Sequence, residues 1–158
     1  MRYVKEISSI TNSTSVFSDT GNTVIDSILN HKLNYAYENG MEINLQLKIP
    51  NILHINSTDL CIILGNLLDN SIEAVDKIKI NKKINIKIEY EKGILFIFIS
   101  NPCLISTIQD THTTTKTDQD NHGFGLINVN KSLANNKGMI NSYIKDSIYY
   151  VEVMLYEI

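Results

Sequence analysis

Apolar residues at helical spacing predict two long helices in the first half of the chain. The first begins after Asn22, a residue type suited to the N-cap, and ends at Gly40, which favours the C′ position. The second runs from about residue 59 to 78, with Ser57 or Thr58 as its N-cap. The buried face of the first helix is predicted to contain Ile25, Ile28, Leu29, Lys32 and Ala36.

Alternating apolar and polar residues predict strands on both sides of the second helix. Residues 42–49 alternate cleanly and end at Pro50. Residues 83–90 alternate in the same way, whereas residues 94–100, ILFIFIS, are apolar almost throughout, which predicts a strand buried on both faces. The turn EKG joins these two strands in a hairpin, and residues 139–158 form a second hairpin.

Two segments do not continue these patterns. Residues 101–122 are rich in Thr and Asp and predict a long loop, which is either a functional lid or disordered. Residues 1–20 begin at helical spacing and continue into a Ser/Thr/Asn stretch, so we interpret them as the remnant of an upstream helical region. Residues 21–158 then form one α+β domain, a two-layer sandwich of a mostly antiparallel sheet with helices on one face.

Composition narrows the class of protein. A chain of 158 residues that is 43% hydrophobic is long enough for one domain with a sizeable core. Its net charge is -3 and its lysines are scattered, so we expect no nucleic-acid partner. Cys61 and Cys103 stand far apart and fit a reducing compartment, and no apolar run approaches the ~20 residues of a membrane span, so we expect a cytoplasmic domain.

The segment LGNLLDNSIEA, residues 64–74, combines a leucine stripe with two amides. Asn66 and Asn70 are four residues apart and therefore share a helix face beside that stripe. An Asn side-chain oxygen is a ligand that Mg²⁺ accepts together with water and phosphate oxygens. The two amides either face a cleft or bond the backbone of a neighbouring loop, and Glu73 extends the same polar face.

The segment HGFGLINVN is a second candidate site. Gly123 and Gly125 flank Phe124 directly ahead of a predicted helix, so backbone amides and the positive end of the helix dipole would converge there. This arrangement favours an anion such as phosphate, although a simple tight turn also explains it. In the preceding loop, Lys116 and the hydroxyls of Thr113–Thr115 are placed to close over phosphates.

These segments resemble known motifs. LGNLLDNSIEAV resembles the N box, and HGFGLINV the second glycine box, of the GHKL ATP-binding superfamily, whose fold is the Bergerat type with a long ATP lid. The stretch TTTKTDQDNHGFGL resembles the form found in AgrC-like quorum-sensing sensor histidine kinases. The resemblance implies ATP and Mg²⁺ as ligands and places these residues around the nucleotide: Asn66, Asn70, Asn101, Lys116, His122, Gly123, Phe124, Gly125 and Leu126.

The resemblance also implies individual roles. Asn70 would bind Mg²⁺, Asn66 would lie near the phosphates, and Lys116 would be the lid cation, with Asn66 and Lys116 acting in catalysis. GHKL members that hydrolyse ATP have Glu in place of Asn66, and an amide cannot accept a proton from water. Transfer of the γ-phosphoryl group to a protein side chain is therefore implied. The usual DxGxG box is replaced by ISNP, where Asn101 offers a neutral acceptor to the adenine amine and hence a weaker bond.

The chain does not contain a suitable acceptor histidine of its own. His31, His54, His112 and His122 all lie in predicted loops or inside the ATP-binding domain. The resemblance therefore implies an acceptor-histidine helical domain in the same parent protein, which would be dimeric and anchored in the plasma membrane, and a response regulator downstream. Two alternatives stay open: a nucleotide-sensing module without turnover, and an anti-sigma-type protein serine kinase.

Overall fold

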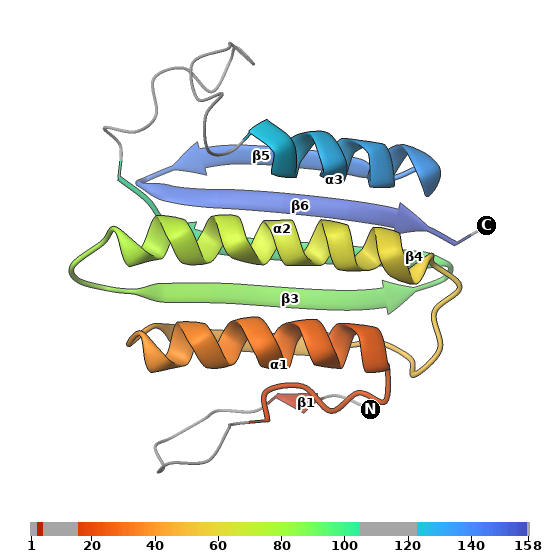
Figure 1. The fold of residues 1–158 in the computed structure, drawn as a ribbon, viewed down its shortest axis with the longest axis horizontal. Helices are drawn as coiled ribbons and strands as arrows, with labels where there is room; N and C mark the ends of the chain where they lie inside the picture. Colours follow the sequence, from red (N-terminus) through yellow and green to blue (C-terminus); the bar gives the residue numbers. More distant parts are fainter. Residues whose placement is uncertain (1–2, 5–15, 105–122, 158) are drawn as a thin grey trace.

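The computed structural model describes residues 3–4, 16–104 and 123–157. Its strands form one sheet in the order β1-β2-β3-β4-β6-β5, and the three helices within these residues all cover the same face (Figure 1). The strands are β1 (Tyr3–Val4), β2 (Glu42–Lys48), β3 (Lys83–Glu91), β4 (Ile94–Pro102), β5 (Met139–Lys145) and β6 (Ile148–Tyr156). The helices are α1 (Thr23–Glu38), α2 (Ser57–Asp76) and α3 (Gly123–Asn135). The predicted α+β class is confirmed.

The sheet is antiparallel except at one pair of strands. β2 and β3 are parallel, and α2 is the connection that carries the chain from one to the other. All the other neighbouring strands pair antiparallel. The helix with the N-box motif is therefore the crossover of a βαβ unit, which holds it against the middle of the sheet.

Both ends of α1 form as predicted. The Asn22 side chain accepts a hydrogen bond from the backbone N–H of Ile25 at 3.1 Å. At the other end Gly40 has φ 77, and the backbone N–H groups of Gly40 and Met41 donate to the carbonyls of Tyr37 and Ala36. These bonds form the Schellman motif, which favours glycine because it requires a left-handed residue at C′.

The cap predicted for α2 is wrong by one or two residues. The N-cap is Asn56, and its side-chain oxygen accepts from the backbone N–H of Asp59 at 3.0 Å, so Ser57 and Thr58 already lie within the helix. The sequence offers three capping residues in a row, and only the backbone conformation decides between them. Asn56 has φ -56 and ψ 124, outside the helical region, as an N-cap requires.

The prediction that residues 94–100 are buried on both faces is also wrong. Leu95, Ile97 and Ile99 are buried against the helices, whereas Ile94 and Phe96 on the opposite face are only half-buried. The reason is the placement of the helices on one face, which leaves the other face of the central strand without a covering layer. On that open face the ring of Phe98 lies 6.1 Å from that of Tyr150.

The start of the chain differs from the helical spacing expected there. Tyr3 and Val4 form a short strand that pairs antiparallel with Leu47 and Gln46 of β2. Further along, the backbone N–H of Phe17 donates to the Asn30 side-chain oxygen at 2.7 Å, so this segment is attached to α1. The division of the chain at residue 20 stays a prediction. Within the described residues, no helix combines the length and hydropathy needed to cross a bilayer.

Candidate functional site

The N-box amides lie at the edge of the buried face of α2. Asn66 and Asn70 are half-buried, between the core side and the exposed side of the helix. The Asn66 side-chain nitrogen donates to the Ile62 carbonyl at 2.7 Å, which leaves its oxygen free to point across to α3. That oxygen lies only 2.8 Å from the position that a Cβ on Gly125 would occupy. The structure thus brings the N box and the glycine box together, as the sequence predicts.

The glycine box forms the first turn of α3 itself, where the sequence pattern placed it directly ahead of the helix. Gly123, Phe124, Gly125 and Leu126 are the first four residues of the helix. The N–H groups of the first turn have no acceptor within an α-helix, and the helix dipole gives this end a partial positive charge. Three backbone donors next to the Asn66 amide, the N–H groups of Gly123, Phe124 and Gly125, make a site that suits phosphate oxygens.

Asn101 lies at the end of β4 and is fully buried. Its side-chain nitrogen donates to the Pro102 carbonyl at 2.9 Å. Its side-chain oxygen is buried and has no hydrogen-bond partner within residues 3–4, 16–104 and 123–157. An unpaired buried acceptor fits the role implied for this residue, which is to accept a hydrogen bond from an adenine amine.

Two neighbours of Asn101, Tyr149 and Cys103, are uncharged at neutral pH. Burial raises the pKa of the Tyr149 hydroxyl, and Tyr149 is the residue paired with Asn101 across β4 and β6. Burial likewise raises the pKa of the Cys103 thiol, two residues further along. Both groups therefore stay protonated. A ligand at the end of β4 would meet neutral hydrogen-bonding groups in a region of low dielectric constant.

Two predicted site residues, Lys116 and His122, lie outside the described residues.

Asn70 lies one helical turn beyond Asn66 and is half-buried. Its side-chain amide has the chemistry of a Mg²⁺ ligand, which would supply charge neutralisation to a bound triphosphate. Leu126 is 44% exposed.

Sequence reasoning missed a buried polar cluster that joins the far ends of α2 and α3. The side-chain nitrogen of Asn136 donates to Asp59 at 3.0 Å, and that of Asn135 lies 3.3 Å from the same carboxylate. Asp59 is 8% exposed. The cluster holds the end of α3 on the first turn of α2. The adjacent asparagines in LANN are a weak sequence signal, because nothing local identifies a partner more than seventy residues away.

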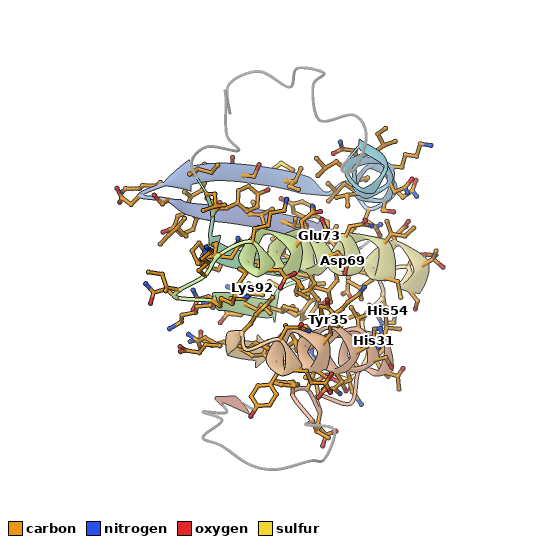
Figure 2. All side chains as sticks on the ribbon, turned by 60° about the vertical axis from the view of Figure 1, so that its left-hand side comes forward. His31, Tyr35, His54, Asp69, Glu73 and Lys92 are labelled. Carbon is orange, nitrogen blue, oxygen red and sulfur yellow. The ribbon has the colours of Figure 1, made fainter. Side chains whose placement is uncertain are left out.

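A groove of about 460 Å³ lies between α1 and α2, and Asn66 is one of its lining residues. Lys32 of α1 and Asp69 of α2 form an ion pair across it at 2.7 Å. Figure 2 shows Asp69 and Glu73 on α2 and His31 on the neighbouring α1. Gly65 also lines the groove, and a Cβ added there would have no atom within 4 Å. No group of three or more His, Cys, Asp or Glu residues that could hold a metal ion occurs among the described residues.

Sequence comparison identifies the family. Residues 55–156 match the family described as the GHKL domain, a range that covers α2, β3, β4, α3, β5 and β6. The chain therefore belongs to the GHKL family. A search of curated proteins finds no match.

Several solved structures with a similar fold come from histidine kinases. The catalytic domain of the histidine kinase ThkA, in one nucleotide-free form, superposes with a TM-score of 0.64 at 16% identity, covering 88% of this chain and 93% of that one. Another nucleotide-free form of ThkA gives 0.60 at 17% identity, with the same coverage of both chains. The Acinetobacter baumannii histidine kinase AdeS gives 0.61 at 16% identity over 85% of this chain. The match spans 64% of the AdeS chain, and at these identities the likeness establishes the fold.

Proposed function

We propose that this GHKL domain binds ATP with Mg²⁺ and positions the γ-phosphoryl group for transfer to a histidine located outside the described domain. The observation that carries the proposal is the contact between the Asn66 amide oxygen and the first turn of α3 at Gly125. It places a side-chain amide beside the N–H groups of Gly123, Phe124 and Gly125, which have no acceptor within the helix. Such preorganised donors are what phosphoryl transfer needs, because its catalysis consists mainly of positioning and charge stabilisation.

The nucleotide would extend from the first turn of α3 to the end of β4. The phosphates would take the N–H groups of Gly123, Phe124 and Gly125, beside Leu126, with Asn70 as a ligand of the metal. The base would reach the buried end of β4, where the Asn101 oxygen lacks a partner. Lys116 would contribute a lid cation, and His122 would lie next to the glycine box in the chain.

Transfer is favoured over hydrolysis because the chain lacks a general base at the N box. Asn66 has an amide that cannot accept a proton from an attacking water. A neutral imidazole needs no such base, because its ring nitrogen already carries a free electron pair. The AgrC-like character of the lid sequence extends the proposal to a quorum-sensing receptor with a membrane-anchored, dimeric parent and a response regulator downstream.

Radiolabelled ATP distinguishes the proposal from its alternatives. The domain would be mixed with a separately produced helical domain that carries an acceptor histidine, and the labelled product tested for stability in acid and alkali. Phosphohistidine is labile in acid and stable in alkali, whereas phosphoserine shows the reverse. Label that survives acid would replace the proposal with a serine kinase, and ATP binding without label would replace it with a nucleotide-sensing module.

A further inference from the structure

Two buried polar atoms have no hydrogen-bond partner among the residues that the structure describes. They are the side-chain oxygens of Ser71 and Asn101. Ser71 is 1% exposed and Asn101 is 0% exposed, so bulk water does not reach either one. Unpaired buried polar groups destabilise a fold, and most buried polar atoms in proteins have a partner. A partner beyond the described residues is therefore expected, and a bound ligand is one that would supply it.

The two side chains face the same layer of the domain. Ser71 belongs to the buried face of α2, together with Leu67, Leu68 and Ile72. Asn101 continues the buried side of β4 by strand alternation. α2 contacts β4, and in Figure 1 the two elements overlap and run in the same direction, toward the end where β4 stops. Each residue lies near that end of its own element.

Neither oxygen is used locally. A serine inside a helix often donates to the carbonyl four residues earlier, but the Ser71 hydroxyl makes no such bond. The Asn101 nitrogen is held by the Pro102 carbonyl, which can only accept, so the amide must turn its oxygen away from Pro102. The pair thus offers one fixed acceptor, from Asn101, and one hydroxyl that can donate, from Ser71.

We propose that Ser71 is a second base-recognising residue, and that Ser71 and Asn101 together read the edge of adenine. This inference rests on the proposed function and names how that site selects its base. Adenine carries an amine donor beside the ring acceptor N1. The Asn101 oxygen accepts from the amine, and the Ser71 hydroxyl donates to N1.

The same pair disfavours guanine. Guanine has a carbonyl oxygen where adenine has the amine, and an N–H group where adenine has N1. The Asn101 oxygen would then face another acceptor, and because Pro102 holds the amide, the side chain cannot turn its nitrogen toward the base without losing that bond. Selectivity arises from a site that leaves its buried polar groups unpaired with the wrong ligand.

The test measures nucleotide binding by calorimetry for the wild-type domain and for Ser71→Ala. The probes are ATP, 1-deaza-ATP, which lacks the N1 acceptor, and GTP. We expect Ser71→Ala to weaken ATP binding about 3- to 10-fold, the range of one hydrogen bond. We expect the same substitution to leave 1-deaza-ATP binding unchanged, because that ligand cannot accept from Ser71. GTP should bind the wild-type domain more weakly than ATP.

A matched control is Ser100→Ala. Ser100 is also a buried serine, but its hydroxyl lies on the opposite face of β4 and accepts from Asn85 at 3.2 Å. This variant should bind ATP and 1-deaza-ATP as the wild type does. Unfolding of the nucleotide-free protein supplies a second readout, since Ser71→Ala removes an unpaired buried hydroxyl and should leave stability unchanged or raise it.

Two results would overturn the inference. Equal weakening of ATP and 1-deaza-ATP by Ser71→Ala would assign Ser71 to packing alone. Unchanged ATP binding by Ser71→Ala would mean that a buried water satisfies the hydroxyl instead. A wild-type domain that binds no nucleotide at millimolar concentration is a different outcome, because it would remove the proposed function as a whole.

Discussion

The two flanks of α2, one facing α3 and one facing α1, differ in the space around the glycine that lies on each. On the flank facing α3, Gly125 lies so close to Asn66 that an added Cβ would be 2.8 Å from the Asn66 oxygen. On the flank facing α1, Gly65 lines a groove of about 460 Å³, and an added Cβ would have no atom within 4 Å. The comparison teaches that a helix can be closely fitted to one neighbour and leave open space toward the other, with Asn66 at the border of the two flanks.

Charge separates the flanks as well. The α1 flank is crossed by the ion pair between Lys32 and Asp69, whose side chains are 29% and 46% exposed. Ion pairs at such exposure contribute little to stability, typically about 0–1 kcal/mol. The α3 flank instead presents neutral amides, from Asn66 and from the helix backbone. The backbone N–H groups suit a site for a highly charged triphosphate, because they donate to phosphate oxygens without first forming an internal ion pair, whereas the Asn66 oxygen that faces α3 only accepts.

The largest effect should follow from Asn70→Asp. A carboxylate would place a negative charge beside the phosphates and remove the amide donors, so we expect Mg²⁺-dependent ATP binding or transfer to fall about a hundredfold or more. Calorimetry with and without Mg²⁺ measures the loss. Asp69→Asn, a change in the opposite direction on the α1 flank, is the control and should bind nearly as the wild type does. Full activity of Asn70→Asp would exclude the residue from the metal site.

A smaller effect on transfer is expected from Gly125→Ala. The added methyl group must displace the end of the Asn66 side chain, which is flexible, so the fold should tolerate the change. The displaced amide should reduce phosphotransfer about ten- to a hundredfold, the effect of a small misplacement in a site that works by positioning. Single-turnover transfer and thermal unfolding separate these two consequences. If transfer stays normal, the contact between the two boxes has no catalytic role.

Gly65→Ala is the matched substitution on the other flank. An alanine inside a helix is favoured over glycine by about 0.5–1 kcal/mol, and here it meets no neighbouring atom. We therefore expect a rise of that size in the free energy of unfolding, measured by urea denaturation. ATP binding should stay unchanged. A decrease in the free energy of unfolding would show that the added methyl group does not fit in the groove.

The smallest effect is expected at Glu157, which binds the loop before α2 through a hydrogen bond. Glu157 accepts hydrogen bonds from the Tyr90 hydroxyl and from the backbone N–H of His54. The bond from Tyr90 comes first among the causes that lower the pKa of Glu157, followed by the bond from His54. The same bond to Glu157 raises the pKa of Tyr90.

These two shifts define a pH window. A carboxylate with a lowered pKa stabilises the fold above its unfolded pKa of about 4.3, and loses that contribution as pH falls through the folded value. A phenol with a raised pKa stabilises below about pH 10 and loses its contribution as pH rises further. Glu157→Gln should therefore differ most from the wild type, in urea midpoint, between about pH 5 and 9. A difference that persists at pH 2 would have another origin.

Local signals account for much of the fold. Periodicity places α1, α2 and the hairpin of β3 and β4 close to their observed bounds, because apolar spacing directly reflects which face is buried. The turn of that hairpin contains Lys92 at φ 51 and Gly93 at φ 82, as its sequence leads one to expect. The apolar pattern of residues 94–100 does not reveal that Ile94 and Phe96 are only half-buried, because their burial depends on where the helices pack.

The candidate site was predictable only in part. The N-box and glycine-box motifs identify Asn66 and Gly125, and the structure confirms that they meet. Ser71 directly follows Asn70 and occupies a core position of the helix. Only the three-dimensional structure reveals that its hydroxyl has no hydrogen-bond partner among the described residues. The partner of Asp59 likewise depends on a contact between residues far apart in the chain. Interactions of this kind have no sequence period to reveal them.

The buried polar cluster of Asp59, Asn135 and Asn136 restricts how α3 can move, because it holds only one end of the helix. It fastens the last turn of a helix of 13 residues, while the first turn stands at the far end, beside Asn66. At 1.5 Å per residue such a helix is about 20 Å long, so a tilt of about 5° around the fastened end moves the other end by about 1.7 Å. A small rotation of α3 about the Asp59 cluster would therefore be enough to change the distance between Gly125 and Asn66.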